Sequence, residues 1–156
     1  MLESLLLKRS ERIRRVGDYL DEVVLPLAQR LKVDSIHLEI GCGHGHWLSS
    51  FAASRSMEVF VGIDIIQKRI CRSLRKKELC NLPNLHFIKT EAWEFIEAAK
   101  GKLKISDTYL MYPDPWPKKR HHKRRLVQIP FLETLAEVSS PEARFFLKTD
   151  SIDYFE

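Results

Sequence analysis

Through residues 1–32, apolar side chains recur every three or four positions, which is the spacing of one face of an α-helix. The members of this face are Leu6, Ile13, Val16, Leu20, Val23, Leu27 and Leu31. The pattern predicts an N-terminal helix, and Gly17 is the position at which that helix could divide into two pieces.

From Ser35 the pattern changes to short apolar runs, each followed by a longer segment with helical spacing. Strands are expected over residues 35–40, 58–63, 84–89, 108–111 and 143–148. Helices are expected from about residue 46 and over 65–79, 92–100 and 124–138, with Pro130 separating or kinking the first turn of the last one. This alternation predicts an α/β fold with a doubly wound, mainly parallel sheet and helices on both faces.

The same pattern indicates one domain over residues 1–156, made of an N-terminal helical segment, 1–33, and a Rossmann-like core, 34–156. Residues 151–156 are typical of the first turn of another helix, so little would cover the fifth strand. Because an exposed sheet edge is a liability, we expect a polypeptide cut short after strand five, with the C-terminal strands missing.

Positive charge is concentrated in one segment. The net charge is +5, and residues 118–125 alone carry six Lys or Arg, so the rest of the chain sums to −1. Such a concentration favours a polyanion as partner. Two helical clusters add to it. The first cluster is Lys8, Arg9, Arg12, Arg14 and Arg15, and it is explained equally well by a solvated helix face and by an RNA contact. The second cluster is Lys68, Arg69, Arg72, Arg75, Lys76 and Lys77.

Three cysteines without a CxxC spacing are typical of reduced thiols, which indicates a cytoplasmic protein. No apolar run has the length of a membrane span, so no membrane partner is expected. Cys42, His44 and His46 form a C-x-H-x-H pattern that matches no common zinc site, so we expect no metal.

Six residues of types that bind ligands or act in catalysis fall at or just after the ends of expected strands. They are Glu39, Gly41, Asp64, Glu91, Asp114 and Asp150. In a doubly wound sheet, ligands bind beyond the carboxyl ends of the strands, near the point where the strand order reverses. These positions therefore predict a ligand site at that edge.

Three glycines, Gly41, Gly43 and Gly45, follow the first strand at alternate positions. They let the backbone turn sharply and approach a ligand closely. At the end of the second strand, the carboxylate of Asp64 suits two ribose hydroxyls. Beside the turn Glu39 suits an ammonium group, and Glu91 suits an adenine amine.

An ammonium, a ribose and an adenine together describe S-adenosylmethionine. The alternative cofactor is NAD, whose turn is usually GxGxxG and serves a pyrophosphate. Here His46 replaces the last glycine of that motif, and the acidic Glu39 would repel a pyrophosphate. We therefore expect S-adenosylmethionine. The alternative for the three glycines is a tight strand-to-helix turn that binds no ligand.

After the fourth strand, Pro113-Asp-Pro-Trp116 holds an acid on a stiff backbone beside an aromatic ring on which a base could stack. A proline-rich turn with a core tryptophan would explain the same residues. The basic segment that follows favours nucleic acid, with its RNA-binding candidates being Lys119, Arg120, His121, Lys123, Arg124 and Arg125.

These residues resemble the bacterial tRNA (guanine-N7)-methyltransferase family. The matching segments are Glu39-Ile-Gly41, Gly62-Ile-Asp64, Pro113-Asp-Pro-Trp116, Lys118, His121, Lys123-Arg-Arg125, Gln128-x-Pro130-Phe131 and Thr149-Asp150. The resemblance implies a class I methyltransferase fold and methylation of a guanine at N7 in the tRNA variable loop. It also implies that Glu39, Asp64, Glu91 and Asp114 bind the cofactor, that Asp114 is catalytic, and that Lys118 and Asp150 bind substrate.

Two departures accompany the resemblance. Position 91 is Glu where the family often has Asp, and the family's T-x-x-E segment lies beyond residue 156. The activity of these residues alone, the set of tRNAs, and a monomeric or homodimeric state all stay open. The remaining alternatives are a methyltransferase for an exocyclic amine of a base, a non-catalytic RNA-binding protein and a NAD-dependent reductase.

Overall fold

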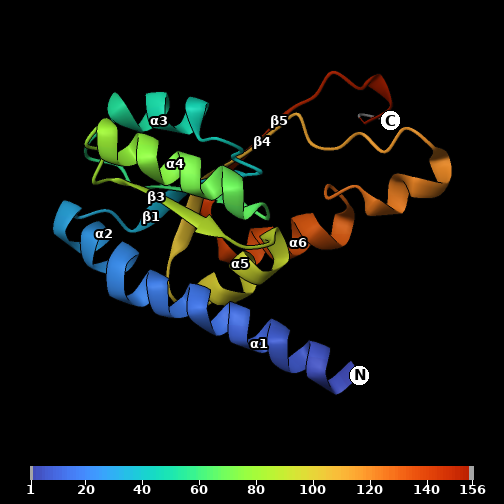
Figure 1. Ribbon diagram of the computed structural model, residues 1–156, viewed down its shortest axis with the longest axis horizontal. Helices are drawn as coiled ribbons and strands as arrows, with labels where there is room; N and C mark the ends of the chain where they lie inside the picture. The colour runs from blue at the N-terminus through green and yellow to red at the C-terminus, as the bar shows by residue number, and fades with distance from the viewer. Residues whose placement is uncertain (1, 155–156) are drawn as a thin grey trace.

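Five strands form one sheet in the order β3-β2-β1-β4-β5, and each neighbouring pair is parallel (Figure 1). The computed structural model describes residues 2–154. The strands are β1 Ser35–Ile40, β2 Phe60–Asp64, β3 Leu85–Lys89, β4 Lys104–Met111 and β5 Ser139–Lys148. The strand order reverses between β1 and β4, so the predicted doubly wound α/β fold is confirmed.

Helices cover both faces of this sheet. They are α1 Leu2–Tyr19, α2 Leu25–Leu31, α3 His46–Ala53, α4 Gln67–Leu79, α5 Ala92–Ala99 and α6 Ile129–Val138, with the π-helix η1 Leu20–Val24 and the 3₁₀-helices η2 Lys119–Arg124 and η3 Ile152–Tyr154. One apolar core joins the N-terminal helices, α5 and α6 to the sheet, and a smaller one lies under α3 and α4. Figure 1 shows α3 and α4 together on one side and α1 running along the other.

The N-terminal helix is irregular at Leu20–Val24 and not at Gly17, so that prediction was wrong. Pro26 has no backbone N–H to donate, and just before it the N–H of Leu25 bonds to the carbonyl of Leu20 in a π-type turn. Gly17 is buried inside α1, and a Cβ there would lie 3.5 Å from Cε of Lys102. That distance is an ordinary van der Waals contact, so the helix continues through Gly17 and no close approach there requires a glycine.

Two strands begin earlier than their apolar runs predict. Residues 104–107 already pair with β1, and Ser139 opens β5. The early start of β4 was not predicted because Asp107, a polar residue, interrupts the apolar run. Asp107 is 5% exposed, and its carboxylate accepts hydrogen bonds from Nε and Nη2 of Arg144 at 3.0 and 2.9 Å. A neighbouring strand thus supplies the partner that lets a carboxylate occupy a buried strand position.

The helix expected over residues 124–138 begins only at Ile129, five residues later than predicted, because residues 125–128 are not helical. Pro130 lies in the first turn of α6, where its missing N–H costs nothing. The 3₁₀-helix η2 lies before that segment. No helix in residues 2–154 is long and apolar enough to cross a membrane.

Candidate cofactor and nucleic-acid site

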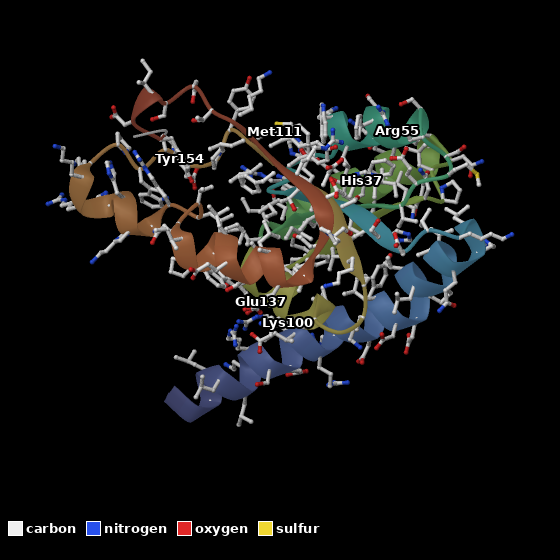
Figure 2. All side chains as sticks on the ribbon, turned by 180° about the vertical axis from the view of Figure 1, so that it is seen from behind. His37, Arg55, Lys100, Met111, Glu137 and Tyr154 are labelled. Carbon is white, nitrogen blue, oxygen red and sulfur yellow. The ribbon has the colours of Figure 1, made fainter. Side chains whose placement is uncertain are left out.

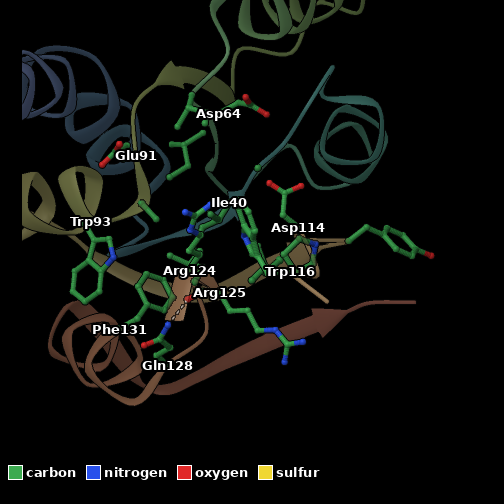
Figure 3. Close-up of a pocket in the computed structure, with 18 of the residues that line it drawn as sticks. Ile40, Asp64, Glu91, Trp93, Asp114, Trp116, Arg124, Arg125, Gln128 and Phe131 are labelled. Carbon is green, nitrogen blue, oxygen red and sulfur yellow. Dashed lines mark hydrogen bonds between the residues drawn. The ribbon is translucent and has the colours of Figure 1, made fainter. Parts of the chain in front are cut away.

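A cavity of about 660 Å³ lies at the carboxyl edge of the sheet (Figure 3). Its lining includes the expected site residues Gly41, Asp64, Glu91, Asp114, Lys123, Arg124 and Arg125. The size falls within the usual range of small-molecule pockets, roughly 300–1,000 Å³. Residues from four segments that are distant in sequence therefore meet where parallel strands end.

The glycine turn has the conformation that its composition predicts. Gly41, Gly43 and Gly45 all have positive φ, at 72°, 57° and 67°, which side chains rarely adopt. A Cβ on Gly45 would lie 2.5 Å from Cζ of Phe87 and 3.1 Å from Oγ of Ser73. Gly41 alone among the three lines the cavity; the other two shape the turn that leads into α3.

Asp64 ends β2 and holds this turn in place. The N–H of Gly43 donates to Oδ2 at 3.0 Å, and the N–H of Ile66 donates to Oδ1 at 2.8 Å. Arg69 lies 3.5 Å from the same carboxylate. The side chain is 4% exposed and still borders the cavity, so one carboxylate both fixes the turn and faces the ligand space.

Glu39 lies on β1 beneath the turn and is not part of the cavity lining. It is 4% exposed, and burial raises its pKa to about 8. Its Oε2 has no hydrogen-bond partner in the described part of the chain. A buried carboxyl without a partner is costly, and it marks a place where a cationic group would be stabilised.

At the far end of the cavity, Glu91 precedes α5 and is exposed (Figure 3). Next to it stands Trp93, whose ring packs edge-on against Phe131 with centroids 5.4 Å apart. Sequence reasoning missed Trp93, although its place two residues after a strand-end acid was a usable signal. The pair gives this end an apolar wall beside a carboxylate.

Asp114 is exposed on a loop whose backbone is strained. Tyr112 and Trp116 have φ values of 52° and 44°, and bulky side chains in that region cost about 1–3 kcal/mol each. The N–H of Tyr112 donates to the carbonyl of Lys148 at 2.6 Å, which ties the loop to β5. From this loop Asp114 lines the cavity.

The basic segment divides into two groups. Lys123, Arg124 and Arg125 line the cavity, and the Arg124 guanidinium lies over the Trp116 ring at 5.0 Å (Figure 3). The other residues expected to bind RNA or substrate lie outside the cavity lining; they are Lys118, Lys119, Arg120 and His121 of this segment, and Asp150 after β5. His121 contacts Trp116 edge-on at 5.9 Å. Lys118, Lys119 and Arg120 are exposed, whereas His121 is half-buried.

Arg125 makes contacts within the protein that its place in a basic run did not predict. Its Nε donates to the carbonyl of Pro115 at 2.9 Å, and Nη1 donates to the carbonyl of Asp153. The guanidinium lies over the Tyr154 ring at 4.8 Å. No sequence signal connects these partners, because Tyr154 lies in a different segment of the chain.

Cys42 in the glycine turn is buried, whereas His46 at its end is exposed. Burial raises the pKa of the Cys42 thiol, with the charges of Glu39 and Asp64 adding to the effect. Among the described residues, no group of three or more His, Cys, Asp or Glu could hold a metal ion.

The parallel sheet order, the glycine turn and the cavity at the switch point are those of the class I methyltransferase (Rossmann-like) fold. Residues 33–156 match the family model described as "Putative methyltransferase", so the chain belongs to that family. Its tRNA (guanine-N7)-methyltransferase relatives support the resemblance found in the sequence.

Two relatives carry the name tRNA (guanine-N(7)-)-methyltransferase. The one from Nitrosococcus oceani is 38% identical over 119 residues, covering 76% of this chain and 50% of the relative. The one from Syntrophotalea carbinolica is 37% identical over 117 residues, covering 75% and 50%. The chain spans about half the length of these curated relatives.

Among solved structures, PKMT2 from Rickettsia typhi in complex with AdoHcy is similar in fold. The TM-score is 0.55 at 17% identity, and the match covers 70% of this chain and 20% of the other. At this identity the similarity supports the fold alone.

Proposed function

We propose that this chain provides the cofactor and catalytic portion of an enzyme that methylates N7 of a guanine in the tRNA variable loop. One observation carries the proposal: Gly41, Asp64 and Asp114 share a cavity with Lys123 and Arg124. A cofactor-type turn, an acid and a phosphate-binding segment are thereby combined in one site. A site that combines these features also favours a cytoplasmic protein that acts on tRNA.

The residues present fit S-adenosylmethionine, which supplies an electrophilic methyl group when it is bound. The unpartnered carboxyl of Glu39 would receive the ammonium group, and Asp64 would accept hydrogen bonds from the ribose hydroxyls. Glu91, beside the apolar wall of Trp93, would face the adenine amine. An acid beneath the turn does not suit a pyrophosphate, so NAD is disfavoured.

Guanine N7 carries a lone pair and no proton, so its attack on a methyl group requires no strong base. Positioning then supplies most of the acceleration, about 7–11 kcal/mol in well-oriented reactions. Asp114 would hold the guanine edge and stabilise the positive charge that develops on the purine. Trp116, with Arg124 over its ring, offers a flat surface for the base.

The test is transfer of labelled methyl from S-adenosylmethionine to unmodified bulk tRNA, followed by nucleoside analysis. The Nitrosococcus oceani relative serves as the positive control. We expect label in 7-methylguanosine, and a single-turnover rate about 10²- to 10³-fold lower for Asp114→Asn. Label in N6-methyladenosine would instead support an exocyclic amine as acceptor.

Two results would overturn the proposal. An unchanged rate in Asp114→Asn would remove that residue from catalysis. Binding of tRNA without calorimetric heat from S-adenosylmethionine would favour a non-catalytic RNA-binding protein.

A further inference from the structure

Two basic clusters lie on helices of the surface, and only one of them is neutralised by acidic side chains. On α1, Arg9 pairs with Glu97, Arg12 with Glu94, Arg14 with Asp18 and Arg15 with Glu11. Four of the five cations in this cluster thus have a carboxylate partner within the protein. The second cluster is on α4, which carries six Lys or Arg and one Glu, a net charge of +5.

Four of the α4 cations form one row, which we call the α4 stripe: Lys68, Arg72, Arg75 and Lys76. Spacings of three and four residues place them on one face of the helix. That face points away from the buried Ile70, and its members Lys68, Arg72 and Arg75 are exposed. At about 1.5 Å per residue, the stripe is roughly 12 Å long.

The stripe has no acidic counterpart in residues 2–154, because no ion pair involves any of its four members. Its contacts are to imidazoles of the glycine turn. Nη1 of Arg72 lies 3.3 Å from Nε2 of His44, and Nζ of Lys76 contacts Nδ1 of His46. Desolvation and the charge of Arg72 lower the pKa of His44, which favours the neutral form of this ring.

Like charges at such spacings destabilise a helix. A row of cations without carboxylates therefore favours an anionic ligand that offers several charges in sequence. The first turn of α4 lies at the carboxyl edge of the sheet, where Arg69 lines the cavity together with Lys123. The stripe thus begins at the rim of the site and leads away from it.

We propose that the α4 stripe is a second phosphate-binding surface for tRNA, separate from the basic segment at residues 118–125. This inference rests on the proposed function, because the target guanine must enter the cavity between the two surfaces. One stretch of RNA backbone then lies along α4 while another is held by η2 and its flanking residues. A row of point charges suits phosphates and reads no bases.

The test compares two triple variants of the chain for tRNA affinity across a salt series. In the stripe variant, Lys68, Arg72 and Arg75 are changed to Gln. In the matched control, Arg30, Lys100 and Lys104 are changed to Gln; these lie toward the amino ends of the strands, where Lys100 pairs with Glu137 at 2.7 Å (Figure 2). Both variants lose three positive charges, so net charge is matched.

We expect weaker tRNA binding by the stripe variant, with the slope of log K against log salt reduced in magnitude by about 2–3. The control should keep its slope within about one unit of the unchanged chain. Equal slopes in the two variants, or no saturable tRNA binding by the unchanged chain, would overturn the proposal. So would loss of polyglutamate binding with tRNA binding intact, which would assign the stripe to an acidic protein.

Folding of each variant is checked by its thermal midpoint before binding is measured. The assay reads RNA binding alone. It therefore stands even if methyl transfer, the test of the proposed function, fails.

Discussion

At the scale of single residues, Glu39 links the fold to the proposed cofactor. It is buried, its Oε2 has no partner among the described residues, and burial raises its pKa to about 8. At pH 7 the carboxyl group is therefore mostly protonated. An ammonium placed beside it would favour the charged form and lower its pKa, so cofactor binding should expel the proton.

We expect binding of S-adenosylmethionine at pH 7 to release close to one proton. Calorimetry in two buffers with different ionisation enthalpies measures this number directly. Glu39→Gln should weaken binding and abolish the release. Glu91→Gln is the matched control: Glu91 is exposed on the cavity wall, so its loss should leave the release in place. Binding without proton release in the unchanged chain would show that the ammonium does not reach Glu39.

Arg125 illustrates a residue whose role its sequence context obscures. Six cations in eight residues predict a uniform RNA-binding segment. In the structure, this one joins the loop of Asp114 to the segment of Tyr154. Its planar guanidinium makes contacts that a lysine ammonium cannot reproduce, even though the charge is the same.

Replacing Arg125 by Lys should therefore loosen residues 113–125 without changing the net charge. We expect tryptic cleavage in this segment to accelerate about fivefold, the factor that corresponds to a lost interaction of about 1 kcal/mol. Arg120→Lys, on an exposed position of the same turn, is the control and should cleave at the original rate. Mass spectrometry of early digests gives both rates. Equal rates in the two variants would remove Arg125 from loop positioning.

At the scale of elements, α1 is attached to α5 by ion pairs of unequal burial. Nε and Nη2 of Arg12 donate to the Glu94 carboxylate at 2.6–3.1 Å, and the Glu94 side chain is 1% exposed. Arg9 and Glu97 form a second pair, but their side chains are 42% and 49% exposed. Removing Arg12 leaves a buried carboxylate without its cation, whereas removing Arg9 leaves an exposed one in water.

Urea unfolding should separate the two pairs clearly. Arg12→Ala is expected to lower the free energy of unfolding more than Arg9→Ala does, because the carboxylate left behind is buried, although the Arg12 side chain itself is 53% exposed. Arg9→Ala is expected to lower it by about 0–1 kcal/mol. Similar losses in the two variants would mean that burial of Glu94 does not set the strength of the α1–α5 attachment.

Element types were largely predictable because apolar periodicity reports directly on burial. The strand-end acids were predictable as a group, since parallel strands bring their carboxyl ends to one edge. Contacts between distant segments were not. The start of β4 depends on Arg144 as partner for Asp107, and the π-turn before Pro26 places an irregularity where no glycine marks it. In both cases tertiary contacts or backbone hydrogen bonds outweigh local preference.

At the scale of the whole molecule, two buried groups give stability opposite dependences on pH. The raised pKa of Glu39, about 8, means that the folded chain keeps a proton that the unfolded chain loses above about 4.5. Stability from this group therefore falls as pH rises from 4.5 to 8. His86 is 3% exposed, and burial, with the charge of Lys77, lowers its pKa to about 4. Its contribution is lost as pH falls from 6.5 to 4.

Between pH 4.5 and 6.5 the two slopes cancel, because one extra proton is bound by the folded state and one by the unfolded state. We therefore expect a plateau in unfolding free energy over that range and a decline on each side. On the alkaline side, up to pH 8, the slope should approach about 1.4 kcal/mol per pH unit, the value for one proton. Urea unfolding at half-unit steps of pH from 4 to 8 measures the profile.

Single variants should separate the two contributions. Glu39→Gln should remove the decline above pH 6.5 and expose a continuous fall on acidification from 6.5. His86→Gln should do the reverse, with stability rising steadily as the pH is lowered from 8 toward 4.5. A profile that keeps its shape in Glu39→Gln would mean that this carboxyl is solvated or paired in solution. That result would also remove the physical basis for expecting proton release on cofactor binding, so the two experiments test the same buried group independently.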